Sequence, residues 1–519
     1  MAMLSKSKYT SFHQCPKKLW MDVYKPEEAK QDDALDSRMS VGTGIGILAQ
    51  KLFGEPQSAV VTNDDGTPDL SRMIKLTQKL LDNNAPIVVE AAFAYDDCYC
   101  AVDILKNTGL HEYTIYEVKS TSHTPGDEKD VEKKVAAYLP DVAYQTYVLR
   151  SLGYTVSGVN LVLLNAEYTL PESKEIVLSD LFTVVNIDKY ITEPLMMDTA
   201  SKIEQAKKVL DSEVEWETEL HSNCKKPYDC PFIDYCMKKR GIKYPSVFNL
   251  YRAQWKKKLE YLNNGIVTFD DVWNNVKLSS ETQKMQVECT MKDVAHVDYV
   301  GIDKFLNTLT YPLYYLDFET VQPAVPEYVG THPYQQVPFQ YSLHIKDNPD
   351  AELRHEEFLG NPDEDPRRPL AESLVKNIPN DACVLAYNKS FECGRIKELA
   401  QMYPDLAEHL LCIERNIIDL MDPFVHCCYY LPSMKDSFSI KSVLPALFPD
   451  SKELNYHNLN ESVQNGAMAM NAFPAMKQMN ESERQVIRKA LLDYCCLDTL
   501  AMVRVHEELR RVSYYVKKY

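Results

Sequence analysis

Runs of apolar residues divide the first half of the chain into strands and helices. Three alternating or continuous runs predict strands over 86–95, 98–105 and 113–120. Residues 106–109 end in glycine and predict a hairpin turn between the last two strands. Helical periodicity over 133–152 stops at Gly153, a residue suited to a helix C-terminus. Another strand is predicted at 158–165, and 203–235 begins as a helix and continues as a loop.

The second half of the chain starts with a charged, helix-rich stretch whose pattern breaks at 263–265. Apolar runs then predict strands over 311–320, 337–345, 352–359 and 382–388. Helical periodicity predicts helices over 368–378, 391–403 and 481–512. Strands interspersed with helices indicate a mixed α/β fold. We expect a first domain over 1–243, a helical connector over 244–310 and a second domain over 311–519.

Length and composition agree with more than one domain. At 519 residues the chain is too long for one hydrophobic core, and 45% hydrophobic with 25% charged residues is typical of a globular protein in water. The N-terminal residues carry no apolar run or cleavage signature, so no signal peptide is predicted. No stretch approaches eighteen consecutive apolar residues, and we expect no membrane partner. Fourteen cysteines outside a secretory context favour a reducing, cytoplasmic location over a disulfide framework.

The net charge of −18 does not by itself exclude a nucleic-acid partner, because binding to phosphates depends on local basic patches. Three such segments comprise Lys225, Lys226, Lys238, Lys239, Arg240 and Lys243; Arg252, Lys256, Lys257 and Lys258; and Arg510, Arg511, Lys517 and Lys518. Each segment is either a phosphate-binding patch or solvated surface that balances neighbouring acids.

Four cysteines bracket the first predicted domain. Cys15 lies in FHQCPKKLW, and Cys224, Cys230 and Cys236 lie in CKKPYDCPFIDYC. Thiolates at such long spacings suit an iron–sulfur cluster, whereas structural zinc sites more often use C-x2–4-C pairs. The chain contains no C-x-x-C. The alternative is that all four are ordinary buried cysteines, as free cysteines commonly are.

Between these cysteines, predicted strands carry carboxylates. In YTIYEVKS the side chains alternate, so Glu117 and Lys119 share one face, and Asp103 on the preceding strand lies opposite them. Glu90 on the neighbouring strand can complete the set. Carboxylate oxygens suit Mg²⁺ or Mn²⁺, and such a metal activates water and neutralises charge on a phosphodiester. The alternative is a solvent-facing strand with alternating polar residues, because this short motif also recurs by chance.

Residues 4–240 resemble the RecB-like branch of the PD-(D/E)XK nucleases, which includes AddB and a four-cysteine CRISPR adaptation nuclease. The resemblance implies a restriction-endonuclease-like fold and a catalytic role for Gln145 in DVAYQTYVL. It also implies a largely structural [4Fe–4S] cluster bound by Cys15, Cys224, Cys230 and Cys236. The chain departs from the family at Leu149, where tyrosine is expected, and in 41–54, which supplies no histidine. A catalytically degenerate, cluster-stabilised DNA clamp is therefore an alternative for the first domain.

A second set of acidic residues comes from three distant segments. Asp317 and Glu319 in YYLDFET share one strand face. Tyr494 and Asp498 in LDYCCLDT share one helix face, and Glu392 begins another predicted helix. Carboxylates converging from a strand and two helices can bind two metal ions about 4 Å apart, which clamp the attacking and leaving oxygens of a phosphodiester. The alternative is a core strand with a surface acid pair, and a tyrosine that only packs.

Residues 311–512 resemble the DnaQ-like DEDD exonucleases in their tyrosine variant, which have a ribonuclease H-like fold. The residues that match the four metal-binding acids are Asp317, Glu319, Glu392 and Asp498. Tyr494 matches the tyrosine that positions the attacking water, and Asn388 and Phe391 match the surroundings of the second motif. Glu392 stands where most of the family has aspartate. We also expect Asp419, Ser439 and Lys441 to line the same cleft.

Together, the two segments resemble a bacterial family of uncharacterised proteins that fuse these two nucleases. The resemblance implies a metal-dependent enzyme that hydrolyses DNA, by cutting or resection in the first domain and by 3′–5′ trimming in the second. DNA repair, CRISPR adaptation and phage defence are all compatible with it. RNA or an RNA/DNA hybrid is the alternative substrate of the second domain, because a few contacts to the 2′-OH decide sugar choice. Protein partners, oligomeric state and the polarity of the first domain stay open.

Overall fold

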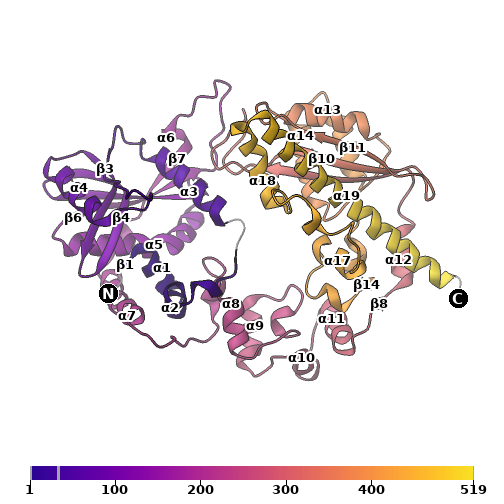
Figure 1. The fold of residues 1–519 in the computed structure, drawn as a ribbon, viewed down its shortest axis with the longest axis horizontal. Helices are drawn as coiled ribbons and strands as arrows, with labels where there is room; N and C mark the ends of the chain where they lie inside the picture. Colours follow the sequence, from indigo (N-terminus) through magenta and orange to yellow (C-terminus); the bar gives the residue numbers. More distant parts are fainter. Residues whose placement is uncertain (1–2, 32–34, 518–519) are drawn as a thin grey trace. The chain divides into compact units, whose positions relative to one another are not determined.

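The computed structural model describes residues 3–31 and 35–517. The chain forms two compact units, and both contain sheets and helices, so the fold is mixed α/β (Figure 1). Unit 1 comprises Met1–Gly241 with Pro323–Gln335, and unit 2 comprises Ile242–Gln322 with Gln336–Tyr519.

This division differs from the expected domains in two places. Residues 323–335 belong to unit 1, because Ala324 and Tyr334 pack in one of its hydrophobic clusters. The helical stretch expected as a connector over 244–310 belongs to unit 2, where Ile302 is fully buried in the core. The chain therefore leaves unit 1, enters unit 2, returns briefly and enters unit 2 again.

Unit 1 is built on a seven-stranded sheet of order β2-β3-β4-β5-β6-β7, in which β1 also pairs with β4. The strands are β1 (Leu4–Ser5), β2 (Gln57–Ser58), β3 (Ile87–Tyr95), β4 (Cys98–Gly109), β5 (Glu112–His123), β6 (Thr155–Asn165) and β7 (Phe182–Asn186). The three predicted strands form the antiparallel neighbours β3, β4 and β5. The turn between the last two lies at 110–111 rather than 106–109, because their pairing continues to Gly109.

Helix α5 (Glu128–Ser151) connects β5 to its parallel neighbour β6. It starts earlier than the periodicity predicts, because Asp127 caps it by accepting hydrogen bonds from the N–H groups of Lys129 and Asp130. Gly153 follows its C-terminus with a φ of +87°, a left-handed conformation that glycine adopts without strain.

Unit 1 contains further helices besides α5. They are α1 (Lys6–Gln14), α2 (Pro16–Tyr24), α3 (Leu35–Ala49), α4 (Leu70–Asp82), α6 (Leu178–Leu181), α7 (Glu193–Leu210) and α8 (Ile233–Lys239). Helices α1 and α7 pack against α5, and α2 packs against α1 and α7. Leu19, Tyr144 and Ile203 from three of these helices are buried in the largest cluster of the unit.

Unit 2 contains a five-stranded sheet of order β11-β10-β9-β12-β13. Its strands are β9 (Leu313–Val321), β10 (Val337–Lys346), β11 (Arg354–Leu359), β12 (Cys383–Ala386) and β13 (Ile417–Asp419). Strands β9 to β11 are antiparallel, whereas β12 and β13 run parallel to β9. Two short strands, β8 (His296–Val297) and β14 (Tyr429–Tyr430), pair separately.

The helices of unit 2 include the long C-terminal α19, which runs across β9 and β10 (Figure 1). They are α9 (Trp255–Asn263), α10 (Phe269–Asn275), α11 (Glu281–Lys292), α12 (Tyr299–Leu306), α13 (Arg367–Asn377), α14 (Ser390–Met402), α15 (Ala407–Arg415), α16 (Asp422–Val425), α17 (Ile440–Leu447), α18 (Gly466–Ala475) and α19 (Glu481–Lys517). Helices α13 to α15 pack on one face of the sheet, and α19 packs on the other. None of the described helices combines the length and apolar character needed to cross a bilayer.

Candidate active sites

The carboxylates predicted in unit 1 lie on adjacent strands. Asp103 projects from β4, and Glu117 and Lys119 project from β5. Asp103 Oδ2 accepts a hydrogen bond of 2.8 Å from the backbone N–H of Val118. Lys119 Nζ donates to Glu117 Oε1 at 2.8 Å and also pairs with Asp141 of α5. The structure therefore brings Asp103, Glu117 and Lys119 together.

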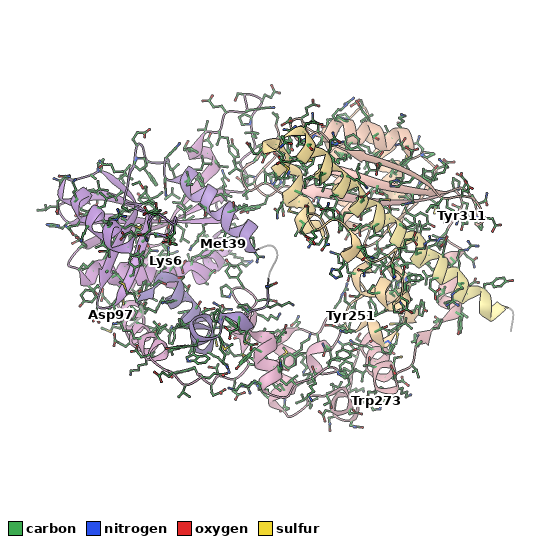
Figure 2. The ribbon with its side chains drawn as sticks, viewed as in Figure 1. Lys6, Met39, Asp97, Tyr251, Trp273 and Tyr311 are labelled. Atoms are coloured by element: carbon green, nitrogen blue, oxygen red, sulfur yellow. The ribbon has the colours of Figure 1, made fainter. Side chains whose placement is uncertain are left out.

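Two further side chains contact Glu117, which is only 1% exposed. Gln145 Nε2 donates to Glu117 Oε2 at 2.6 Å, so the predicted glutamine lies in the same site. Lys6, labelled in Figure 2, donates from Nζ to Glu117 Oε1 at 2.9 Å and lies 3.8 Å from Asp103 Oδ1. Sequence reasoning missed Lys6, because this residue reaches the site through the long-range pairing of β1 with β4.

Glu90 lies in β3 directly opposite Asp103 of β4, because the pairing skips one residue on each strand without a change of register; the φ of Glu90 is +53°. Its carboxylate accepts a hydrogen bond of 3.4 Å from Gln50 Nε2. The resemblance expects a histidine in segment 41–54 as a metal ligand. In this chain Gln50 of that segment contacts Glu90, a candidate metal ligand. Amide and carboxylate oxygens are both hard donors, so Gln50 and Glu90 suit the same type of metal as Asp103. No local sequence pattern pointed to Gln50.

The positive charges in this site separate the pKa values of its carboxyl groups. Burial opposes the ionisation of Glu117, yet Lys119 and Lys6 hold its pKa at about 2. Burial and the charge of Glu117 raise the pKa of Asp103 to about 6. Burial and the charge of Asp103 raise the pKa of Glu90 to about 7. A divalent cation beside these groups would favour the ionised forms of the last two.

The four predicted cluster cysteines of unit 1 line one small cavity: Cys15, Cys224, Cys230 and Cys236. The first precedes α2, and the other three come from α8 and the loop before it. Gln14 connects these segments, because its Nε2 donates to the backbone oxygens of Asn223 and Tyr228 at 2.9 and 2.8 Å. Burial raises the pKa of the Cys230 thiol to about 12, so metal binding must displace its proton. The fold thus brings thiols from distant parts of unit 1 to one place.

The spacing of the sulfur atoms bears on which metal group fits this cavity. A single zinc ion binds thiolates at about 2.3 Å, which holds four sulfurs within about 4 Å of one another. Among the described residues, the groups of three or more candidate ligand atoms within 4.8 Å of one another do not include these cysteines. In a cubane cluster each thiolate binds a different iron, so the sulfurs stand further apart. The cavity thus offers four candidate thiolate ligands for a metal group.

A groove in unit 1 extends from Lys119 toward the loop that carries the cysteines. The cations and aromatic rings that line it include Lys18, Lys119, Lys133, Lys226, Tyr138 and Tyr228. Neither Lys133 nor Lys226 has an ion-pair partner within the described part of the chain. Cations beside aromatic faces are the combination that contacts the backbone and bases of single-stranded nucleic acids.

The carboxylates predicted in unit 2 converge beneath α19. Asp317 and Glu319 come from β9, and Asp498 comes from α19. One oxygen from each carboxylate lies within 4.8 Å of the other two. Glu319 and Asp498 are buried, and Asp317 is half-buried. Such a group of oxygens suits Mg²⁺ or Mn²⁺.

Two tyrosines accompany Asp498. Tyr494, one helical turn earlier in α19, is 3% exposed, and its ring centroid lies 5.9 Å from that of Tyr456. Tyr456 Oη donates to Asp498 Oδ1 at 2.5 Å. A Cβ placed on Gly466 would lie 4.0 Å from Tyr494 Oη and 3.8 Å from Glu319 Oε2, so both atoms face the start of α18. Sequence reasoning missed Tyr456, which lies in a short 3-10 turn without periodicity.

Glu392 and Asp419 take different positions from the other acids. Glu392 lies outside the group of three, in the first turn of α14, and is 2% exposed. Its Oε2 has no hydrogen-bond partner among the described residues. Asp419, which was also expected to line the cleft, lies near enough to Glu392 for its charge to raise the pKa of that carboxyl group. Its two oxygens accept backbone hydrogen bonds from Asn388 at 2.9 Å and Lys389 at 3.0 Å, so it holds the turn before α14.

Burial and mutual repulsion raise the pKa values of these carboxyl groups. Burial, followed by the charge of Asp498, raises the pKa of Asp317 and of Glu319 well above the ordinary range, and Glu392 adds to both shifts. Burial raises the pKa of Asp498 to about 6, although Tyr456 and Tyr494 oppose the shift. Burial raises the pKa of Glu392 to about 8. Divalent cations would relieve this repulsion and convert the groups to carboxylates.

Lys441 and Ser439 lie at the start of α17. Lys441 is exposed, and its charge opposes the burial that raises the pKa values of Glu319 and Asp498. This coupling places an exposed cation near the carboxylates. Ser439 instead forms hydrogen bonds with Ser437 and Ser442 within its own turn. Of the two, Lys441 is the residue available to a phosphate group.

Ion pairs occupy part of the basic segments noted in the sequence. The residues with a nearby acidic partner include Lys225, Lys239, Arg240, Lys257 and Arg511. Lys518 lies outside the described residues, and the side chain of Lys517 is not described. These basic segments are therefore partly balanced by neighbouring acids. Lys226, from the first segment, lines the groove that also contains Lys119.

Comparison with known proteins gives similarities without an assigned activity. A family model described as a domain of unknown function (DUF2779) matches residues 314–439, which span most of the unit 2 sheet. The chain is 27% identical over 222 residues to uncharacterized protein MG366 of Mycoplasma genitalium, covering 39% of this chain and 33% of that protein. It is 29% identical over 225 residues to uncharacterized protein UU173 of Ureaplasma parvum, covering 39% and 31%. The matches thus span about a third of each relative. No solved structure matches the chain.

Proposed function

We propose that this protein is a divalent-metal-dependent nuclease with two separate active sites, one in each unit. The observation that carries the proposal is the gathering of Asp317, Glu319 and Asp498 within 4.8 Å, with Tyr456 bonded to the last of them. Metal ions on converging carboxylates hydrolyse phosphodiesters. The proposal includes a ribonuclease H-like fold for unit 2 and a restriction-endonuclease-like fold for unit 1, after the families that the sequence resembles.

In unit 2, Asp317, Glu319 and Asp498 would hold the metal, and Glu392, whose charge acts on the first two, would be a further ligand. The metal, when bound, activates water and neutralises charge that develops on the phosphate. Tyr494 orients the attacking water from the adjacent helical turn. Tyr456 fixes the Asp498 carboxylate through its hydrogen bond of 2.5 Å.

In unit 1, Asp103, Glu117 and Glu90 would hold a metal, and Lys119 would orient the water. Gln145 keeps Glu117 in position through its hydrogen bond of 2.6 Å. The four thiols would hold a [4Fe–4S] cluster with a structural role, because they join segments from both ends of the unit. The proposed substrate enters along the groove that ends at Lys119.

DNA is the proposed substrate of both sites, with cutting or resection in unit 1 and 3′–5′ trimming in unit 2. DNA repair, CRISPR adaptation and phage defence are the settings that such a pair of activities would serve. RNA or an RNA/DNA hybrid is the other substrate class for unit 2, because the same metal chemistry acts on either backbone.

The test is cleavage of end-labelled single-stranded DNA, double-stranded DNA, RNA and an RNA/DNA hybrid by the purified full-length chain. Each substrate is incubated with Mg²⁺, with Mn²⁺ and with a chelator. We expect metal-dependent loss of nucleotides from the 3′ end of DNA. Absence of cleavage of all four substrates with both metals would contradict the proposed function, and cleavage of RNA alone would reassign the substrate.

Tyr494→Phe is expected to slow 3′-end trimming by ~10- to 100-fold, the range typical of positioning or proton-transfer groups. Asp498→Asn should slow it further, because that change removes a metal ligand. The rate measured against Mn²⁺ concentration separates the two effects. The concentration for half-maximal rate should rise for Asp498→Asn and stay nearly constant for Tyr494→Phe.

Tyr456→Phe is the matched control. It makes the same chemical change, loss of a phenol hydroxyl, in the tyrosine that donates to the Asp498 carboxylate. We expect this variant to need more Mn²⁺, since the freed carboxylate is less well oriented. A Tyr494→Phe enzyme with the parent rate would mean that Tyr494 only packs, and the tyrosine-variant assignment should then be dropped.

The position of Lys6 favours a second candidate function for unit 1, a DNA clamp without catalysis. Its ammonium group lies 2.9 Å from Glu117 Oε1 and 3.8 Å from Asp103 Oδ1. These are the two carboxylates that would share a metal, so a metal must displace this ammonium group before it can bind both. A site whose counter-charge is already supplied by a side chain binds a divalent cation less readily.

Lys6→Met is expected to lower the Mn²⁺ concentration that unit 1 needs by ~10-fold, because it removes the competing charge. Lys6→Arg is the control that keeps the charge. The measurement is DNA cleavage in an Asp317→Ala background, so that unit 1 alone contributes. If unit 1 is inactive both in the protein with Lys6 and in Lys6→Met, the clamp is favoured. If unit 1 is active with Lys6 and inactive in Lys6→Met, Lys6 takes part in the reaction instead.

A further inference from the structure

A second cluster of metal-ligating side chains lies in unit 2, outside the carboxylate site. We infer that His344, His355 and Cys496 form a site for a zinc ion, independent of the Mg²⁺ or Mn²⁺ sites proposed above. One nitrogen of each imidazole and the sulfur of Cys496 lie within 4.8 Å of one another. Imidazole and thiolate select zinc, whereas Mg²⁺ and Mn²⁺ prefer oxygen donors.

Strand pairing places the two histidines directly opposite each other. His344 of β10 is the register partner of His355 of β11, and their ring centroids are 4.5 Å apart. Cys496 comes from α19, which packs on both strands. A cation in this position would join the edge strand β11, its neighbour β10 and the covering helix.

A chain of hydroxyl groups orients both imidazoles. Thr499 Oγ1 shares hydrogen bonds with His344 Nδ1 at 2.7 Å and with Ser342 Oγ at 2.6 Å. Ser342 Oγ shares another with His355 Nε2 at 2.9 Å. Metal-ligating histidines use their second nitrogen in this way, which fixes the tautomer and the ring orientation. The remaining nitrogen of each ring has no hydrogen-bond partner in the described chain, so both nitrogens are available to a cation.

The protonation of these groups is compatible with zinc. Burial and the neighbouring His355 ring lower the pKa of His344 to about 4, so its imidazole is in the neutral form that binds metals. Burial raises the pKa of the Cys496 thiol to about 11, so zinc must displace a proton from sulfur. Both values describe the metal-free cluster.

Helix α19 contributes to this site and to the carboxylate site from different sides. Cys495 faces β9, where its sulfur lies 3.7 Å from Asp317 Oδ2. Cys496 lies about 100° further around the helix axis and joins His344 and His355, and Thr499 contacts His344 of β10. Zinc binding and the proposed nuclease chemistry therefore use separate ligands, and one can fail without the other.

The zinc site has a structural character. Cys496 and His355 line an open groove together with Glu357, which lies two residues after His355 and hence on the same strand face. Structural zinc sites have four protein ligands. We assign the fourth position to the Glu357 carboxylate, which lines the groove but lies outside the group of three within 4.8 Å. Four ligands from two strands and one helix would hold β11 against α19.

The test measures metal bound to the full-length chain after removal of metals with a chelator. The stripped protein is titrated with Co²⁺, whose absorption reports thiolate ligation and tetrahedral geometry, and with Zn²⁺ in competition with a coloured chelator. Because the four thiols of unit 1 are candidate ligands for the same ions, the signal assigned to this site is the difference between parent and variant. We expect Cys496→Ser and His355→Ala each to lose one bound ion per chain. Thr499→Val should weaken zinc binding about 10- to 100-fold, since it removes the partner of His344.

Cys412→Ser is the matched control, because Cys412 lies on α15 of the same unit and outside the cluster. It should keep the parent's Co²⁺ spectrum and zinc content. Asp317→Ala should also keep them, which separates this inference from the nuclease proposal. Equal Co²⁺ spectra in the parent and in folded Cys496→Ser would overturn the site. If Cys496→Ser fails to fold, unchanged zinc affinity in both Thr499→Val and Glu357→Gln would overturn it.

Discussion

Replacing Asp317 with alanine is expected to abolish 3′-end trimming and to leave the activity of unit 1 intact. Asp317 is one of three carboxylates whose oxygens lie within 4.8 Å, and its removal leaves a metal with two of these ligands. A catalytic metal supplies several kcal/mol of transition-state stabilisation, so the loss should be at least ~10³-fold in rate. The measurement is removal of nucleotides from a 3′ end, with the label at the 5′ end.

Glu117→Ala should have the opposite effect, because Glu117 lies in unit 1 and contacts Lys119, Lys6 and Gln145. Glu356→Ala is the matched control, since Glu356 is an exposed carboxylate on β11 of unit 2. It should keep both activities. Trimming that persists at the parent rate in Asp317→Ala would show that the carboxylates of unit 2 are not its active site.

The Asp317 position also has a readout that needs no substrate. In the metal-free protein the pKa of Asp498 is raised to about 6 and that of Glu392 to about 8. A carboxyl group with a raised pKa stabilises the fold below its unfolded pKa near 4, and this stability is lost as the pH rises through the folded value. Unit 2 should therefore lose thermal stability between about pH 4 and 8 in a chelator. Asp317→Asn or added Mg²⁺ should reduce that loss.

Replacing Cys230 with alanine is expected to remove about four irons and the brown colour from anaerobically purified protein, as a lost cubane implies. It should also destabilise unit 1 far more than unit 2. The cavity lined by the four cysteines joins the start of α2 to the segment around α8, and metal-binding free energy becomes folding free energy at such a site. Iron content and thermal unfolding of the purified chain measure the two effects.

Cys98→Ala is the matched control, because Cys98 is fully buried in β4 and lies outside that cavity. It should lose some packing energy and keep its iron. A colourless parent protein that holds one zinc ion per chain at these cysteines would contradict the cluster. So would a Cys230→Ala variant with the iron content of the parent.

Local patterns were sufficient for the strands that carry Asp103, Glu117 and Asp317, but not for the short strands β1, β2, β7 and β13. The strand runs around Asp103 and Glu117 and around Asp317 predicted β3 to β5 and β9 to β12, because alternation and apolar runs are local properties of a strand. The same alternation predicted that Glu117 and Lys119 would meet, and their atoms lie 2.8 Å apart. The hairpin turn was misplaced, because the ladder hydrogen bonds that extend β4 to Gly109 are not encoded in turn residues alone.

The remaining members of the sites depended on contacts between distant segments. Lys6 reaches Glu117 because β1 pairs with β4, and Tyr456 reaches Asp498 from an irregular turn. Neither contact has a periodic signal, since each is set by packing of elements far apart in the chain. The contact of Gln50 with Glu90 and the packing of residues 323–335 in unit 1 likewise have no local sequence signal.

By itself, the sequence determined the mixed α/β class, most of the strands, and which acidic residues and cysteines were candidates for chemistry. These depend on residue type and on periodicities of two and 3.6, which any short window contains. Only the tertiary structure decided which candidates meet. It gathered Asp317, Glu319 and Asp498 within 4.8 Å, left Glu392 outside that group, and turned Asp419 toward backbone donors. Convergence of this kind is decided by strand register and helix packing, which involve residues hundreds of positions apart.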